Sequence, residues 1–235
     1  METAIFVFYG QLNDFLAKPL RGGEVPANCR GNPTAKHLIE ALGVPHVEVG
    51  QVTVNGTPAG TGHRVQAGER VEVRPPLPGR PVEARFLLDN HLGRLAVYLR
   101  MLGFDSLYRC DYQDVELSEI AAKEERILLT RDRRLLMRKV VKYGYCPRSL
   151  EPEVQLKEVV HRFDLLSLIL PFQRCLRCNG MLQPVSKQQV LARLEPLTKK
   201  YFDTFAICPA CDQVYWPGSH SSHMTDLIQR LQRSG

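Results

Sequence analysis

Between residues 85 and 136 the chain alternates short apolar runs with stretches of helical spacing, and this alternation restricts the possible folds more than any other feature. The runs Arg85–Leu88, Phe104–Tyr108 and Ile127–Thr130 are too short for helices and are typical of buried strands. Apolar residues recur at helical spacing over His91–Leu102, between the first two runs. Strands that alternate with helices predict a parallel sheet with right-handed crossovers.

Acidic residues follow each of these three expected strands. Asp89 comes directly after the first, the loop Asp111–Glu116 follows the second, and Asp132 follows the third. Because the carboxyl ends of parallel strands meet at one edge of a sheet, we expect these acids to converge. Converging carboxylates repel one another unless a cation holds them, and carboxylate and water ligands favour Mg²⁺ or Mn²⁺.

Each acid also has a simpler interpretation. Aspartate caps helices readily, so Asp132 is either the N-cap of a helix that begins near Arg133 or a metal ligand. Asp114 is likewise a plausible N-cap for the helix that contains Leu117 and Ile120. The convergence of three acidic groups favours the metal site over capping alone.

The first 80 residues have a small α+β pattern. An alternating strand at Thr3–Tyr9 precedes a polar loop, and Asn32-Pro33-Thr34 then opens a helix that Gly43 stops. We expect a second strand over His46–Gly56, ending in an Asn-Gly turn, and a closing strand within Ala67–Pro75. Strands, one helix and further short strands predict a compact module of mixed structure.

Composition restricts the class of protein and the compartment. No apolar run approaches a membrane-spanning length, and the first residues lack the basic start and apolar core of a signal peptide, so we expect a cytoplasmic protein without a membrane partner. The formal net charge is +6. Residues 85–148 contain 13 Lys and Arg against 9 Asp and Glu, whereas residues 1–80 contain 8 against 7. The basic bias therefore lies beside the candidate carboxylates and favours a polyanionic substrate.

Four of the seven cysteines form two Cys-x-x-Cys motifs, Cys175 with Cys178 and Cys208 with Cys211. Each motif can present two thiolates to one tetrahedral ion, so the pair predicts a structural Zn²⁺ site, with an insertion between the two knuckles. Two redox dithiols are the alternative, but the motifs lack the expected βαβ setting. The other three, Cys29, Cys110 and Cys146, have no partner spacing, and we expect ordinary packed thiols.

Aromatic and histidine residues follow the second knuckle. Tyr215 and Trp216 could stack on an unpaired base, although packing around the metal site is the simpler role for such a pair. His220 and His223 could replace a cysteine at zinc, but four thiolates already complete the site.

The N-terminal segment has a Val-Asn-Gly hairpin at Val54–Gly56 and the ending Ala-Gly-Glu-Arg-Val-Glu-Val-Arg-Pro-Pro. In these two motifs it resembles the ubiquitin-like β-grasp fold of the ThiS and MoaD sulfur carriers. Those carriers act through a free C-terminal Gly-Gly tail, whereas here the chain continues through Pro75–Pro81. The carrier chemistry is thus excluded, and we expect a binding or packing module followed by a semi-rigid linker.

Two stretches of the central segment have a familiar pattern: Phe-Leu-Leu-Asp-Asn-His-Leu-Gly-Arg-Leu-Ala, from Phe86, and Arg-Ile-Leu-Leu-Thr-Arg-Asp-Arg, from Arg126. In these stretches the chain resembles the PIN-like nuclease family named for the C-terminal domain of the Mut-seven exonuclease. Bacterial members pair a ubiquitin-like domain with this RNase domain and a zinc ribbon. The resemblance implies a β-grasp domain at residues 1–78, a linker at 79–84, an α/β PIN-like (Rossmannoid) domain at 85–170 and a zinc ribbon with a tail at 171–235.

The resemblance also implies roles for individual residues. Asp89 and Asp132 match the family's catalytic, metal-binding acids, and the intermediate acid falls on Asp114, with Glu116 and Asp111 as alternatives. Related proteins often have a further acid where this chain has Asn90.

Other side chains near these acids are candidates for substrate contacts. Thr130 could hydrogen-bond the substrate or a metal-bound water, or simply end a strand, and His91 could transfer a proton. Four arginines could contact backbone phosphates, although a solvated surface role is the alternative for each: Arg94, Arg131, Arg133 and Arg134.

The converging acids predict a metal site, and the family resemblance implies that its reaction is the hydrolysis of RNA, so we expect a metal-dependent ribonuclease. We expect a catalytic Mg²⁺ or Mn²⁺, a structural Zn²⁺, and as substrate a single-stranded, tRNA-like or ribosome-associated RNA. The alternatives are a non-catalytic RNA- or ribosome-binding protein that uses the same basic surface, and an adaptor whose β-grasp domain docks a protein partner.

Overall fold

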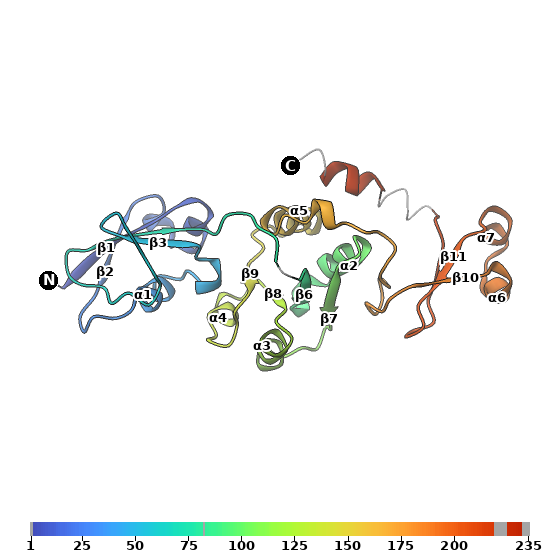
Figure 1. Ribbon diagram of the computed structural model, residues 1–235, viewed down its shortest axis with the longest axis horizontal. Helices are drawn as coiled ribbons and strands as arrows, with labels where there is room; N and C mark the ends of the chain where they lie inside the picture. Colours follow the sequence, from blue (N-terminus) through green and yellow to red (C-terminus); the bar gives the residue numbers. More distant parts are fainter. Residues whose placement is uncertain (1, 82, 219–224, 232–235) are drawn as a thin grey trace. The chain divides into compact units, whose positions relative to one another are not determined.

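The computed structural model describes residues 2–81, 83–218 and 225–231 (Figure 1). The chain forms two compact units, one of Met1–Pro78 with Tyr112–Arg148 and one of Gly79–Asp111 with Ser149–Gly235. Among the described residues, no helix is long and apolar enough to cross a membrane.

The N-terminal part of the first unit is a five-stranded mixed sheet covered by one helix (Figure 1). The strand order is β2-β1-β5-β3-β4, with β1 parallel to β5 and the other pairs antiparallel. Helix α1 (Ala35–Ala41) begins at the expected N-cap, since the Thr34 hydroxyl accepts a hydrogen bond from the His37 backbone N–H. This arrangement confirms the β-grasp expectation. The strands are β1 (Thr3–Phe8), β2 (Glu24–Asn28), β3 (Gln51–Val54), β4 (Thr57–Ala59) and β5 (Arg70–Arg74).

Two details of this sheet differ from the expectations. The polar loop after β1 holds two 3-10 turns, η1 (Gly10–Phe15) and η2 (Lys18–Leu20), and then β2. Strand β2 pairs with β1 on one side only, and such an edge position tolerates Pro26. The expected strand over His46–Gly56 was wrong at its start, because residues 46–48 form the 3-10 turn η3 (His46–Glu48).

The second part of the first unit continues the strand-helix alternation. It consists of α3 (Asp114–Lys123), β8 (Ile127–Leu129), α4 (Arg133–Leu136) and β9 (Gly144–Tyr145), with β8 parallel to β9. Every residue of β8 and β9 is buried, as the apolar run predicted for β8. The expectation that Asp114 caps α3 was wrong, because the cap position belongs to Gln113 and Asp114 is the first helical residue.

The second unit contains the other parallel strands. Strand β6 (Arg85–Leu88) runs parallel to β7 (Asp105–Tyr108), and α2 (Gly93–Met101), which joins them, packs against α5 (Pro152–Arg162) (Figure 1). The Phe86 ring meets the rings of Phe104 and Phe163 edge-on in this core. Two short 3-10 turns, η4 (Asn90–Leu92) and η5 (Leu166–Leu168), follow β6 and α5. Parallel strands flanked by helices confirm the α/β expectation.

The cysteine-rich part of the second unit is a three-stranded antiparallel sheet, in the order β10-β11-β12, with short helices between the knuckles (Figure 1). A small core of Val190, Leu194, Phe205 and Val214 holds the helices against the sheet. The helices supply the insertion that the long interval between the two Cys-x-x-Cys motifs required. The elements are β10 (Gln183–Val185), α6 (Lys187–Val190), η6 (Leu191–Arg193), α7 (Pro196–Tyr201), β11 (Phe205–Ile207) and β12 (Val214–Tyr215).

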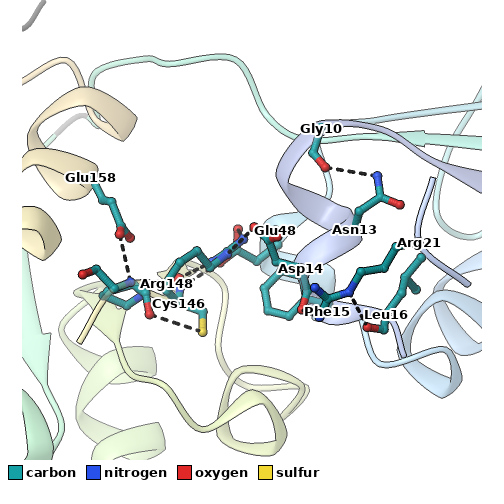
Figure 2. A network of polar contacts seen from close by, with 12 residues as sticks. Gly10, Asn13, Asp14, Phe15, Leu16, Arg21, Glu48, Cys146, Arg148 and Glu158 are labelled. Carbon is teal, nitrogen blue, oxygen red and sulfur yellow. Dashed lines mark hydrogen bonds and ion pairs between the residues drawn. The ribbon is translucent and has the colours of Figure 1, made fainter. Parts of the chain in front are cut away.

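A buried ion pair joins the β-grasp sheet to strand β9 within the first unit (Figure 2). Glu48, at the end of η3, has no exposed side-chain surface, and its carboxylate accepts hydrogen bonds from Arg148 at 3.0 and 3.1 Å and from the Cys146 backbone N–H at 2.7 Å. The Arg148 guanidinium also donates to the Cys146 carbonyl and lies 4.2 Å from the centre of the Phe15 ring. The β-grasp segment is therefore part of the core of this unit.

Burial would lower the pKa of Arg148, but the hydrogen bonds and negative charge of Glu48 outweigh it and hold that pKa above its usual value. A Glu48→Gln variant removes the charge and leaves a largely buried cation. We expect the free energy of unfolding to fall by about 3 kcal/mol, the low end for a broken buried pair because Asp14 also lies 3.8 Å from Arg148. Chemical denaturation of the full chain measures this change.

The matched control is Glu24→Gln, since Glu24 pairs with Arg70 on the exposed face of the same sheet. Exposed pairs contribute little to stability, so this variant should unfold like the wild type. Equal effects of the two substitutions would contradict a structural role for the Glu48 pair.

Candidate active site and metal centre

Asp89 ends strand β6 and caps the turn that follows. Its Oδ1 atom accepts a hydrogen bond from the His91 backbone N–H at 2.8 Å, and the His91 Nδ1 atom lies 3.7 Å from the same oxygen. The Asp89 side chain is buried, whereas the His91 side chain is 80% exposed. The sequence predicted an acid at the carboxyl end of this strand, and the structure adds that its side chain is buried.

Tyr108 supports this turn, a role that the sequence pattern did not predict. It is the last residue of β7, and its hydroxyl donates to the Asn90 carbonyl oxygen at 3.2 Å. The ring occupies the space beside Gly93, where a Cβ atom would lie 2.6 Å from the Tyr108 hydroxyl oxygen. The Gly in the Leu-Gly-Arg-Leu-Ala stretch is thus explained by close packing next to Asp89.

Asp111 is neutralised by a neighbour. Both of its carboxylate oxygens accept hydrogen bonds from Arg109, at 2.9 and 3.0 Å. These bonds hold the pKa of Asp111 below its usual range. A carboxylate already held by a forked guanidinium is a poor ligand for a metal, which weakens the case for Asp111 as the third acid.

Asp114 and Glu116 lie in the first turn of α3, where acidic side chains interact favourably with the positive end of the helix dipole. Asp114 is exposed and forms no hydrogen bond or ion pair with any described residue. Glu116 is half-buried. Of the three acids in this region, Asp114 has the carboxylate most available to a ligand.

Thr130 and Asp132 form a second capped turn, after strand β8. Thr130 is fully buried, and its hydroxyl oxygen accepts a hydrogen bond from the Asp132 backbone N–H at 2.9 Å. Asp132 Oδ1 in turn accepts from the backbone N–H groups of Arg134 at 2.7 Å and Leu135 at 3.3 Å. Capping is therefore observed, yet it uses one oxygen of an exposed carboxylate and leaves the other without a hydrogen bond from a described residue.

The candidate acids are divided between the two compact units. Asp89 and Asp111 belong to one, and Asp114, Glu116 and Asp132 belong to the other. Their convergence around one metal ion stays a prediction from strand direction and order.

The four candidate arginines differ in their surroundings. All four are exposed, and Arg94 lies 5.7 Å from the centre of the Tyr98 ring. Arg133 also donates to the Phe15 carbonyl oxygen at 2.6 Å and lies over the Phe15 ring. Arg133 thus packs against the β-grasp segment. The sequence pattern did not predict this contact, because Arg133 and Phe15 are 118 positions apart.

The four cysteines of the two knuckles come together. Their Sγ atoms all lie within 4.8 Å of one another, with 3.5 Å between Cys175 and Cys211 and 3.4 Å between Cys178 and Cys208. Four thiolates around a tetrahedral Zn²⁺ stand about 3.8 Å apart, so the group could hold a metal such as zinc with small adjustments. Within the described part of the chain, no other set of three or more His, Cys, Asp or Glu ligand atoms lies so close together.

Hydrogen bonds prepare one of these thiols for metal binding. Burial opposes ionisation, but the Tyr215 hydroxyl, 3.1 Å from Cys175 Sγ, and the backbone N–H groups of Cys178 and Arg177 lower the pKa of Cys175 to about 6. Tyr215 therefore packs at the cysteine cluster, as expected. The thiolate is the form that ligates a metal.

The first knuckle is also anchored to strand β7 and helix α2. The buried Arg100 guanidinium donates to the carbonyl oxygens of Ser106, Leu176 and Arg177. The Asn179 side chain accepts from the Ser106 backbone N–H at 3.0 Å and donates to Asp105 at 2.8 Å. The cysteine-rich module and the strand that carries Tyr108 are thus one packed structure.

The three cysteines outside the cluster differ in burial. Cys29 and Cys146 are buried, as expected of packed thiols, but Cys110 is exposed because it lies in the loop after β7. His220 and His223 lie outside the described residues.

Comparison with known families shows to which family the chain belongs. Residues 84–228 match the model of the Mut7-C RNAse domain. The protein belongs to the Mut7-C family. Residues 1–78 match the Mut7-C ubiquitin domain, in agreement with the β-grasp sheet. No curated protein and no solved structure matches the chain.

Gly93→Ala tests the packing beside Asp89. Alanine favours a helix over glycine, so a free site would be stabilised, but here the added methyl would displace the Tyr108 ring and break its bond to Asn90. We expect a loss of about 1–3 kcal/mol in the free energy of unfolding. Gly62→Ala, where no atom lies within 4 Å of the added Cβ, is the matched control and should leave stability nearly unchanged.

Proposed function

We propose that this Mut7-C protein is a metal-dependent ribonuclease that hydrolyses phosphodiester bonds of single-stranded RNA. The observation that carries the proposal is the match of residues 84–228 to the Mut7-C RNAse domain. The positions of Asp89 and Asp132, each at the carboxyl end of a strand in a parallel pair, agree with it.

The proposed catalytic ligands are Asp89, Asp114 and Asp132. One carboxylate oxygen of Asp89 and one of Asp132 accept a hydrogen bond from a backbone N–H, and this bond fixes the orientation of each carboxylate. Asp114 is preferred over Asp111, which Arg109 neutralises, and Glu116 remains the alternative. A bound Mg²⁺ or Mn²⁺ would supply an activated water and stabilise negative charge on the phosphate.

The remaining residues of the proposed site orient groups and bind RNA. Thr130 fixes the turn that carries Asp132 through its hydrogen bond to the backbone, so we assign it a positioning role. Arg94, Arg131 and Arg134 are exposed near these turns and are proposed to contact phosphates, while Arg133 contributes mainly to packing against Phe15.

The four-cysteine group is proposed to bind a structural Zn²⁺. Four thiolates leave no open coordination position, so the ion would stabilise the fold and not take part in hydrolysis. Through Arg100 and Asn179, loss of the ion would loosen strand β7 as well as the knuckle.

The catalytic claim is tested with purified full-length protein and labelled single-stranded RNA, with Mg²⁺ or Mn²⁺ added. We expect Asp89→Asn, Asp114→Asn and Asp132→Asn each to lower the cleavage rate at least about a hundredfold without loss of fold, because each removes charge from the proposed metal site. Circular dichroism checks the fold of each variant.

Two substitutions serve as controls. Asp111→Asn alters the acid that is paired with Arg109, and Glu119→Gln alters an exposed acid of α3. Both variants should keep most of the activity. Absence of cleavage by the wild type across a broad RNA panel with either metal would exclude the nuclease assignment.

The zinc claim is tested by elemental analysis of the dialysed protein. The wild type should contain about one zinc per chain, and Cys175→Ser or Cys208→Ser should lose it and unfold at lower temperature. Cys110→Ser is the matched control, since Cys110 is an exposed thiol outside the cluster. Full zinc content in the Cys208→Ser variant would contradict the proposed ligand set.

A further inference from the structure

The cysteine-rich module has a groove that neither the proposed chemistry nor the zinc site uses. Its volume is about 400 Å³, within the range of small-molecule sites. Its walls come from the segment before the first knuckle, from β10, from the start of β11 and from the end of β12 with the residues just after it. Among the exposed side chains that line it are Phe172, Gln173, Thr204 and Trp216.

Two aromatic side chains on this groove stay open to solvent. Phe172 is 48% exposed and Trp216 is 37% exposed. Phe172 has a φ of +62°, a left-handed conformation that is strained for a bulky side chain. Such strain persists where the surroundings impose it and is found often at ligand sites.

Trp216 packs closely against Gly218. The indole Nε1 atom lies 3.0 Å from the place that a Cβ atom would take at Gly218, which is tighter than most Cβ contacts, so glycine accommodates this ring position best. The Gly218 backbone N–H also donates to the Trp216 carbonyl oxygen at 2.9 Å. A half-open indole is a suitable platform for a planar ligand because a tryptophan side chain has only two rotatable bonds, so little conformational entropy is lost on stacking.

Polar groups beside the aromatic walls can read the edge of such a ligand. The side chains of Gln173 and Thr204 are exposed, and neither forms a side-chain hydrogen bond with a described residue. An amide and a hydroxyl together offer donors and acceptors, as the Watson–Crick edge of an unpaired base requires.

The charge of the module suits a polyanion. Residues 171–218 contain six Lys and Arg against three Asp and Glu. Asp203 pairs with Lys187 and Asp212 pairs with Arg193, which leaves four Lys and Arg against one acid outside these two pairs. Lys199 and Lys200 remain without an ion pair among the described residues, in the last turn of α7, a few residues before Thr204.

We propose that this groove binds one unpaired base of single-stranded RNA, stacked on Trp216 and bordered by Phe172, with flanking phosphates near Lys199 and Lys200. The inference rests on the proposed ribonuclease function and deepens it by naming how the substrate is held. An apolar peptide segment would use the aromatic walls alone, whereas a nucleotide also uses the amide, the hydroxyl and the excess positive charge.

The experiment uses the single tryptophan of the chain as the reporter. The protein is full-length and contains zinc, and it carries Asp89→Asn and Asp132→Asn so that it cannot cleave the RNA. It is titrated with oligouridylate of about ten nucleotides, a usual site size for single strands. We expect this RNA to quench the fluorescence of Trp216. Two control nucleic acids should quench it much less: an abasic strand of the same length, which has the phosphates but no bases, and a duplex whose bases are paired.

Variants in the same background test the stacking contact. Trp216→Ala should weaken oligouridylate binding about tenfold in fluorescence anisotropy with labelled RNA, and Trp216→Phe should restore most of it. Leu197→Ala, an exposed apolar residue of α7 outside the groove, is the matched control and should bind like its parent. Unchanged zinc content excludes misfolding of the module.

The outcomes separate this inference from the proposed function. Equal quenching by the normal and abasic strands, or unchanged affinity of Trp216→Ala while the wild type cleaves RNA, would overturn the base site and leave the nuclease intact. Base-dependent quenching in a protein whose wild type cleaves no RNA would support the base site and exclude the nuclease.

Discussion

The ion pair between Glu48 and Arg148 is the interaction on which the first unit depends. A carboxylate without exposed surface is stable in a protein interior only if its charge is compensated, and here a guanidinium and a backbone N–H provide three hydrogen bonds. Because Glu48 comes from the ubiquitin-like domain and Arg148 follows strand β9, this pair links the packing of the two segments. The β-grasp sheet is therefore a structural partner of the adjoining α/β segment.

The same principle organises the cysteine-rich module. Asn179, directly after the first knuckle, satisfies the backbone of β7 at Ser106, and the buried Arg100 satisfies two carbonyl oxygens of the knuckle. Polar groups that would be costly to bury alone are paired across elements distant in sequence. A metal site at the four thiolates would thus stabilise both the module and the end of β7, where Tyr108 supports the turn of Asp89.

Local features of the site could be read from the chain. Short apolar runs followed by Asp89 and Asp132 indicated buried strands with acids at their ends, and both strands and both acids are found there. Contacts between distant segments could not be read in this way. The position of Arg133 against Phe15, the turn at η3 that brings Glu48 inward, and the bond between Arg109 and Asp111 that distinguishes the three loop acids all depend on side-chain packing.

The sequence by itself determined the parallel strands, the β-grasp pattern and the two cysteine pairs, because hydrophobic periodicity and ligand spacing are local properties. Tertiary structure decided which side chains remain free to contact a ligand. Asp111 is neutralised by Arg109, Asp132 shares one oxygen with its own helix, and Trp216 stands open beside Phe172. These differences arise from burial and from partners that are far apart in the chain, and a linear pattern carries no information about either.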